Sequence, residues 1–381
     1  MKNKSNAVTI LVLMLLIACV TWSGCQTTQE TQESLRIGAI FPLTGPAAES
    51  GIGEQKGLEM ALEEINAAGG VNGQPVELIV YDSKTSGDEA RLAGEKLIFQ
   101  DKVPVIITAI SPECLGIIDQ VEENKVVMLT TSRTPSVTDD PQYSYTFRWA
   151  PTNDTLFPYV AQDLVRLGAK KIAILNESGP YGTTAATALT ESAEKEGLEI
   201  VYDGKYDTSA TDFSSYITAV KASGADTIFH VGYTADTIAI ISEYRAQGLD
   251  EAGIMFVGDD QTGFPAIREA VDHEGIYTQW IYLKDLNDEA KAFHEKYVAK
   301  YGEDTDVVRA YGYSFAHVIK EAAELAKTNT DAESIRDAMY KIKFDSVFGK
   351  DSHFDELGQV IWPRPVLVVT QDGELTRIWE D

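Results

Sequence analysis

The stretch from Val103 to Thr134 constrains the fold more than any other part of the chain. An apolar, β-branched run, Val103–Ile110, stops at Ser111, and an amphipathic segment of about three helical turns follows it. A second apolar run, Val126–Thr130, then ends in a group of hydroxyl side chains. Because neighbouring parallel strands need a crossover connection between them, this strand–helix–strand order predicts a parallel sheet.

The ends of these two strands are the first candidate site. Ligands of parallel α/β sheets bind beyond the carboxyl ends of the strands. Ser111 follows the first strand, where it is predicted to cap the next helix, and the free N–H groups of that helix end suit a carboxylate. Ser132 and Thr134 follow the second strand. The alternative is that Ser111 is only a helix cap and Thr134 only a turn residue.

Residues 1–24 are predicted to be an export signal that does not belong to the fold. They carry two lysines near the start, Lys2 and Lys4, and contain an apolar run, Val8–Val20, that is too short for a stable membrane anchor. Small residues then precede Cys25, in an order that resembles a lipoprotein signal with lipid attachment at Cys25. The alternatives are cleavage elsewhere or retention as a membrane tether. Residues 25–34 are polar and predict a flexible leash.

The charge of the chain excludes several partners. The formal net charge is −27, and without the two leader lysines 30 basic residues face 59 acidic ones, a net charge of −29. Such a surface argues against binding to nucleic acid or to an anionic membrane face. Apart from Cys19 in the leader and Cys25, Cys114 stands alone, so no disulfide framework is expected. Its place on a predicted helix favours a packed core thiol over a reactive one.

The order of elements predicts two α/β lobes. Strand and helix patterns alternate over Leu35–Trp149, and the same alternation begins again over Thr155–Val257. Two long helices, Asp288–Tyr301 and about Asp306–Lys327, cannot form a third domain alone and are expected to pack on an earlier lobe. The end of the chain, Val366–Trp379, predicts a hairpin around Asp372 and Gly373.

Motifs for catalysis are missing from the sequence. There is no His-Glu-x-x-His, no cysteine pair, no nucleophile elbow and no phosphate-binding loop. The glycines at 51, 53 and 57 lie too far beyond their strand to form a dinucleotide-binding turn. We therefore predict no enzyme activity, no cofactor and no metal site.

Several segments, taken together and in order, resemble one family. It is the leucine/isoleucine/valine-binding protein family, the substrate-binding proteins of ABC importers with the type I periplasmic-binding fold. The similarity covers nearly all of the chain after the leader. The matching segments are IGAIFPLTGPAAESG, ALEEINAAGGVNGQPVELIVYD, ISPECLGIIDQVEENKVVMLTTSRTP, ESGPYG, VGYTADTIAIISEYRAQGL and VGDDQTGF.

The resemblance implies an α/β fold of two doubly wound parallel-sheet lobes that close around a three-crossover hinge. The crossovers would lie near Trp149–Thr152, Gly275–Leu283 and Gln359–Pro363. The implied domains are a leader (1–24), a leash (25–34), a first lobe (35–150 with 279–360) and a second lobe (151–278 with 361–381).

The resemblance also implies a binding site for an amino acid. Ser111 matches the residue whose hydroxyl and N–H hold the ligand α-carboxylate. Thr134 matches the residue that meets both carboxylate and ammonium, and Ser132 matches a backbone carbonyl that accepts from the ammonium. Asp260 stands where branched-chain binders carry a glutamate that pairs with the ammonium; its alternative role is that of a helix cap.

Two matched aromatic residues and two departures complete the implied site. Tyr181 and Tyr233 match rings that the second lobe lays over the ligand, although Tyr181 has the alternative role of packing a turn. Ser50, in a segment that predicts a loop, replaces the tryptophan that walls the side-chain pocket, and Asp260 is one methylene shorter than the family's glutamate, so a larger or more polar side chain would fit. Arg133 either binds a second carboxylate of the ligand or points to solvent, and loop arginines more often point to solvent.

The resemblance implies the substrate-binding component of an ABC importer. It would bind an amino acid, branched-chain or related, and deliver it to the permease subunits as a monomer. It would be exported and held by its lipid at the outer face of the cytoplasmic membrane. The alternatives are another solute in the same fold (an aromatic or short-chain carboxylate, an amide or urea) and a sensor ectodomain.

Overall fold

The computed structural model describes residues 33–138, 143–361 and 364–379. The predicted leader, Cys25 and the leash up to residue 32 lie outside the described residues. Within those three ranges, no helix combines the length and the apolar character needed to cross a membrane.

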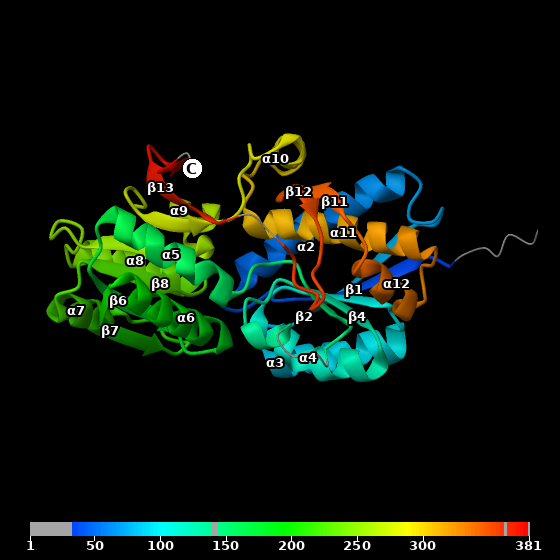
Figure 1. Ribbon diagram of the computed structural model, residues 1–381, viewed down its shortest axis with the longest axis horizontal. Coiled ribbons are helices and arrows are strands. Elements are labelled where there is room, and N and C mark those ends of the chain that lie inside the picture. Colours follow the sequence, from blue (N-terminus) through cyan, green and yellow to red (C-terminus); the bar gives the residue numbers. More distant parts are fainter. Residues whose placement is uncertain (1–32, 139–142, 362–363, 380–381) are drawn as a thin grey trace, which may run out of the picture. The chain divides into compact units, whose positions relative to one another are not determined.

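The first lobe contains a five-stranded parallel sheet in the order β2–β1–β3–β4–β5 (Figure 1). The order reverses at β1, so the carboxyl ends of β1 and β3 flank the topological switch point, where ligands of such sheets bind. The strands and helices are β1 (Leu35–Phe41), α2 (Ala48–Ala67), β2 (Val76–Asp82), α3 (Gly87–Glu95), β3 (Val105–Thr108), α4 (Ser111–Asn124), β4 (Val127–Thr130) and β5 (Thr146–Arg148).

The second lobe contains a seven-stranded sheet in the order β14–β13–β10–β9–β8–β6–β7. Five of its strands are parallel, and the terminal hairpin adds β13 and β14 antiparallel at one edge, which confirms the predicted hairpin. Its elements are α5 (Asn153–Leu167), β6 (Lys171–Glu177), α6 (Pro180–Glu196), β7 (Glu199–Tyr206), α7 (Ser214–Ser223), β8 (Thr227–Val231), α8 (Thr234–Ala246), β9 (Met255–Gly258), the 3-10 turn η3 (Asp260–Gly263), α9 (Pro265–Ala270), β10 (Tyr277–Trp280), β13 (Val366–Gln371) and β14 (Glu374–Arg377).

The chain passes between the two lobes three times, which confirms the predicted fold class of two doubly wound α/β lobes joined by three crossovers. It leaves the first sheet after β5 and the second sheet after β10. The segment between β10 and β13 packs on the first lobe, with α11 against α2 and α12 against β4. Its elements are α10 (Asp288–Tyr301), α11 (Val307–Ala326), α12 (Ala332–Met339) and the hairpin β11 (Phe344–Ser346) and β12 (Gly349–Ser352).

Close contact between α2 and α11 depends on two glycines. A Cβ atom at Gly57 would lie 2.0 Å from the carbonyl oxygen of Arg309, and one at Gly312 would lie 1.9 Å from that of Glu54. The two backbones therefore touch, and the helices lie side by side in Figure 1. This contact fixes the position of the α2 face that carries Ser50 and Glu54.

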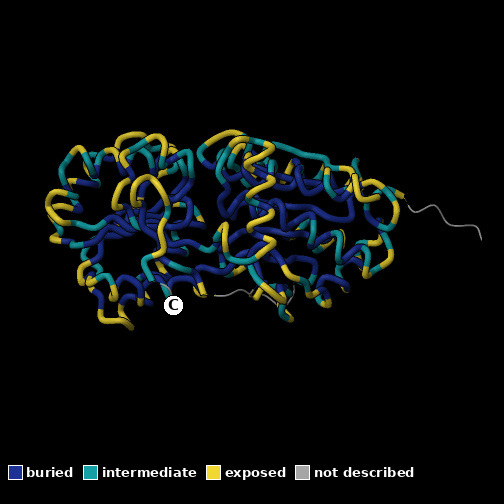
Figure 2. Tube along the Cα trace, turned by 90° about the horizontal axis from the view of Figure 1, so that it is seen from above, coloured by how far each residue is buried: buried dark blue, intermediate teal, exposed yellow. Residues whose placement is uncertain are grey.

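Buried apolar strands form the interior, and exposed residues gather on the outer loops and helices (Figure 2). At the first crossover the fully buried Trp149 stacks on Phe344, with ring centroids 5.8 Å apart, and meets Phe354 edge-on at 5.3 Å. Cys114 is buried in the core, as predicted, and its burial raises the pKa of the thiol to about 12. A thiol with such a pKa is a poor nucleophile at neutral pH.

Candidate functional site

One cavity brings together most of the residues predicted to bind a ligand. The residues around it enclose about 430 Å³ of space that no protein atom fills, including space open to solvent. Both lobes contribute, through the carboxyl ends of β3 and β4 on one side and of β6, β8 and β9 on the other. Six of the seven predicted residues line it: Ser50, Ser111, Ser132, Tyr181, Tyr233 and Asp260.

The first wall carries hydroxyl groups at the start of α4. The hydroxyl of Ser132 donates a hydrogen bond to that of Ser111 at 3.0 Å, and both residues are buried. The prediction that Ser111 caps α4 is wrong, because Ser111 is the first residue inside the helix. Glu113 supplies the cap instead, since its carboxylate accepts from the N–H groups of Ala109 (2.9 Å) and Ile110 (3.0 Å). The Ser111 hydroxyl is therefore available at the cavity.

Thr134 is the predicted residue that does not line the cavity. It is buried, and its carbonyl oxygen accepts from Arg148 at 2.6 Å. Its hydroxyl oxygen is also buried and has no hydrogen-bond partner within the described part of the chain. A buried hydroxyl without a partner is unfavourable, so this atom is suited to meet a group that the protein itself does not supply.

Arg133 and Asp260 form an ion pair across the cavity. Only 7% of the Arg133 side chain and 3% of the Asp260 side chain are exposed, so the expectation that Arg133 points to solvent is wrong. Burial raises the pKa of Asp260, and the guanidinium of Arg133 opposes that rise. Asp260 is not the cap of η3 either, because Asp259 occupies that position and accepts from the N–H of Thr262 at 3.4 Å.

Two tyrosine rings form the wall of the second lobe. The rings of Tyr181 and Tyr233 lie 5.9 Å apart and are tilted by 32°. The Tyr181 hydroxyl donates to Asp259, so the ring is held from its far end. Burial and the neighbouring charge of Asp260 raise the pKa of Asp259 to about 8. The turn before Tyr181 is also fixed, because Glu177 accepts from the N–H of Gly182 at 2.5 Å.

The wall opposite α4 is made by α2 and α11. Ser50 lies in the first turns of α2, so the prediction of a loop there is wrong, and its hydroxyl donates to the side-chain oxygen of Gln261 at 3.4 Å. Glu54, one turn further along α2, lines the same wall with Val308 and Tyr311 of α11.

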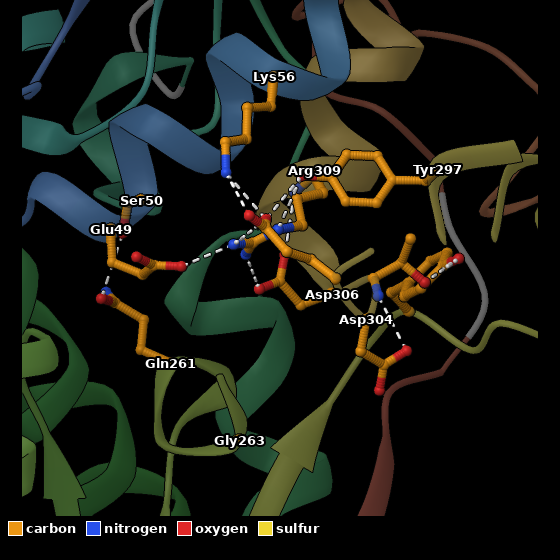
Figure 3. Close-up of polar contacts among 12 residues, drawn as sticks. Glu49, Ser50, Lys56, Gln261, Gly263, Tyr297, Asp304, Asp306 and Arg309 are labelled. Carbon is orange, nitrogen blue, oxygen red and sulfur yellow. Dashed lines mark hydrogen bonds and ion pairs between the residues drawn. The ribbon is translucent and has the colours of Figure 1, made fainter. Parts of the chain in front are cut away.

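A buried arginine holds this wall in place. Figure 3 shows Arg309 of α11 between Asp306 and Glu49, the residue before Ser50. Its guanidinium donates to Glu49 at 2.7 Å, and it lies 3.6 Å from Glu303, which also pairs with Lys56 at 2.7 Å. These charge-assisted contacts join α2 to α11 beside the cavity.

Sequence reasoning missed Glu54, Gln261, Phe264, Val308 and Tyr311, which also line the cavity. Glu54 follows Ser50 by four residues, a spacing that places both on one helix face once α2 is known to start at Ala48. Tyr311 lies in a long buried stripe of α11 that predicts only core packing. Among the residues that the structure describes, no group of three or more His, Cys, Asp or Glu is arranged to hold a metal ion.

Comparisons with known proteins agree with this architecture. Residues 34–374 match the family model described as "Periplasmic binding protein". A leucine-, isoleucine-, valine-, threonine-, and alanine-binding protein of Pseudomonas aeruginosa is 25% identical over 351 residues, which is 91% of this chain and 93% of the relative.

Two solved structures show the same fold. The branched-chain amino acid transporter substrate binding protein LivJ of Streptococcus pneumoniae, in complex with isoleucine, is 25% identical with a TM-score of 0.82, over 90% of this chain and 98% of that one. A solute binding protein of an R. palustris ABC transporter, in complex with 4-hydroxybenzoate, is also 25% identical with a TM-score of 0.80, over 91% and 95% of the two chains.

Proposed function

Because the chain belongs to the periplasmic binding protein family, in its leucine/isoleucine/valine-binding type I branch, we propose that it binds an amino acid in the interlobe cavity for an ABC importer. The family binds small solutes outside the cytoplasm and delivers them to permease subunits. The proposal adds the class of solute, the residues that hold it and the attachment of the protein to the membrane.

The Arg133–Asp260 pair is the observation that carries the proposal. It places one buried positive and one buried negative charge at the same cavity. A solute of a single charge sign leaves one of these charges poorly matched, whereas a zwitterion offers a carboxylate to Arg133 and an ammonium to Asp260. Arg133 and Asp260 already compensate each other, and a zwitterion brings one charge of each sign, so it is the class of solute that keeps both buried charges matched.

The first wall supports the same orientation. The hydroxyls of Ser111 and Ser132 and the first N–H groups of α4 lie where the α-carboxylate would be held. The ammonium would then face Asp260, with the backbone carbonyl of Ser132 as a second acceptor. Tyr181 and Tyr233 would cover the ligand from the second lobe.

An aromatic carboxylate is the second candidate. The tyrosine rings offer stacking surfaces, and Arg133 neutralises Asp260, so an anion is not repelled as strongly as an unpaired aspartate would repel it. The R. palustris relative was solved with 4-hydroxybenzoate. Such a ligand has no ammonium group to offer the Asp260 carboxylate, which then keeps Arg133 as its charged partner. This candidate is therefore the weaker one.

Two measurements test the proposal. Mass spectrometry of the small molecules released by denaturing freshly purified protein is expected to show an amino acid. A thermal-shift comparison of L-leucine, L-glutamine, the deaminated leucine analogue 4-methyl-2-oxopentanoate and 4-hydroxybenzoate is expected to show stabilisation by an amino acid and by neither of the two acids, since a ligand that binds the folded state raises the melting temperature. Stabilisation by either acid without stabilisation by an amino acid would refute the amino-acid assignment.

The proposal includes export and a lipid anchor at Cys25, with the protein monomeric and docking on its permease. Cys25→Ala is expected to abolish incorporation of a fatty-acid label and to release the protein from the membrane fraction. Retention of the label by the variant would exclude attachment at Cys25.

A further inference from the structure

The carboxyl group of Glu54 is a polar group at the cavity that the proposed binding of an amino-acid backbone does not use. Glu54 lines the cavity and is 1% exposed. Its Oε1 contacts the hydroxyl oxygen of Thr131 at 2.9 Å. Its Oε2 is buried and has no hydrogen-bond partner within the described ranges.

The two contacts of the Thr131 hydroxyl indicate where the proton of Glu54 lies, and therefore whether Oε2 accepts hydrogen bonds. The Thr131 hydroxyl also contacts the carbonyl oxygen of Ala109, which can only accept. One hydroxyl carries one hydrogen, so if Thr131 donates to Ala109, the proton in the contact with Glu54 must come from Glu54. Glu54 is then a neutral acid with its proton on Oε1, and Oε2 is a carbonyl oxygen that accepts hydrogen bonds.

The surroundings of Glu54 agree with a neutral acid. Burial raises its pKa well above the ordinary value, the hydrogen bond with Thr131 opposes that shift, and the charges of Glu113 and Asp306 add to it. The backbone of Glu54 is also held in position, because its carbonyl oxygen lies against Gly312 of α11.

The rest of this wall is polar as well. Ser50 lies one turn away on α2, where its hydroxyl meets Gln261, and Tyr311 faces the cavity from α11. In the family that the sequence resembles, a tryptophan at the position of Ser50 walls the pocket for the ligand side chain. An apolar ligand side chain would leave Oε2 buried without a donor, which we expect to weaken binding by about tenfold or more.

We propose that the cavity selects solutes whose distal end carries a neutral hydrogen-bond donor, an amide or a hydroxyl group, which Oε2 of Glu54 accepts. This inference rests on the proposed function, because it assigns the far end of the same ligand. It distinguishes the chain from a binder of purely aliphatic branched-chain amino acids.

Calorimetric titration with matched amino acids tests the inference. L-Asparagine and L-leucine are near-isosteric, as are L-glutamine and L-methionine, and only the amide of each pair offers a distal donor. The wild type is expected to bind the amide of the better-bound pair about tenfold tighter than its apolar counterpart. Equal or tighter binding of the apolar members would overturn the inference and leave the proposed function standing. Failure of all four to bind would count against both.

Variants at position 54 separate the possible roles of the carboxyl group. Glu54→Met removes the acceptor at similar length and is expected to abolish the preference for the amide. The conservative variant Glu54→Gln is expected to restore it, because its amide can donate to Thr131 and present an oxygen in place of Oε2. Glu59→Met makes the same change on α2 away from the cavity wall and serves as the matched control.

Each result with these variants supports or contradicts the role of Glu54 as a neutral hydrogen-bond acceptor. An unchanged preference in Glu54→Met would overturn the inference, and so would a large loss of affinity in Glu54→Gln, because that loss indicates an ionised carboxylate paired with an ammonium. If Glu54→Met does not fold, as judged by circular dichroism, the comparison of Glu54→Gln with the wild type still distinguishes a neutral acceptor from a charged one.

Discussion

At the residue scale, Thr134 combines two opposed requirements. Its hydroxyl is buried without a partner in the described part of the chain, which destabilises the protein, yet the family resemblance assigns it to the charged ends of the ligand. A residue that lowers the free energy of unfolding but increases the affinity for a ligand is typical of a functional site.

Thr134→Val tests this assignment, because valine keeps the shape and removes the hydroxyl. Without ligand, we expect the variant to be more stable than the wild type by about 1 kcal/mol, since it no longer buries an unpaired hydroxyl. Its affinity for the ligand should fall by about 10- to 100-fold, as for the loss of a hydrogen bond to a charged group. Urea unfolding and calorimetry measure the two effects. Thr134→Ser, which keeps the hydroxyl, is the control, and unchanged affinity in Thr134→Val would contradict the role.

Residues at strand ends could be placed from sequence because their position follows from the strand pattern. Ser111 and Ser132 come directly after apolar runs, so a parallel sheet brings them to one edge. Arg133 could not be placed in this way, because its burial depends on Asp260, which lies 127 residues away in the chain. Glu54 was missed because a loop was expected where α2 begins, and without the helix nothing relates it to Ser50. That these residues bind a solute stays a prediction.

At the scale of elements, one helix pair and one turn hold the cavity. Helices α2 and α11 touch at Gly57 and Gly312 and carry the wall opposite α4. The turn η3 carries Asp260 and Gln261, and His273 binds it to the sheet of the second lobe. The His273 Nε2 lies 2.8 Å from the carbonyl oxygen of Thr262, and Nδ1 lies 2.7 Å from the hydroxyl of Thr370.

Gly312→Ala should separate α2 from α11. The new methyl group would lie 1.9 Å from the carbonyl oxygen of Glu54, so one helix must shift. We expect a loss of about 1–3 kcal/mol, as for other overpacked sites, despite the gain of about 1 kcal/mol that alanine brings to a helix interior. Binding should weaken as well, because Ser50 and Glu54 move with α2. Ser314→Ala is the control on the same helix, and wild-type denaturant stability in Gly312→Ala would show that the contact is not tight.

The stability of η3 should depend on pH through His273. Its carbonyl contact at Nε2 requires a hydrogen there, and because burial keeps the ring neutral at neutral pH, Nδ1 then accepts from the hydroxyl of Thr370. Burial lowers the pKa of His273 to about 4, while an unfolded histidine titrates near pH 6.5. Between these values the unfolded chain binds more protons, so the contribution of His273 is present above about pH 6.5 and is lost as the pH falls.

The stability difference between the wild type and His273→Asn isolates this contribution from the other titrating groups. The advantage of the wild type should be greatest above about pH 6.5 and shrink by up to about 1.4 kcal/mol per pH unit between pH 6.5 and 4. Urea unfolding at half-unit pH steps measures it. A difference that stays constant over this range would mean that the ring is not held neutral.

For the whole molecule, the balance between joined and separated lobes depends on contacts across the cavity. The structure joins the lobes there through the ion pair of Arg133 with Asp260 and the hydrogen bond of Ser50 with Gln261. The three crossovers let such lobes rotate as bodies, so a few polar contacts decide the equilibrium. Removing one partner of a buried ion pair leaves the other without compensation unless water reaches it.

Arg133→Met should therefore favour separated lobes, because separation is the way for Asp260 to regain water. If the pair contributes about 1–3 kcal/mol to holding the lobes together, its loss shifts the ratio of the two forms by about 5- to 150-fold. Small-angle X-ray scattering without added ligand should then give a larger radius of gyration than for the wild type. Arg245→Met removes an arginine whose 2.7 Å pair with Asp250 lies within the second lobe, so it should leave the radius unchanged. An equal radius for Arg133→Met and the wild type would mean that other contacts hold the lobes together.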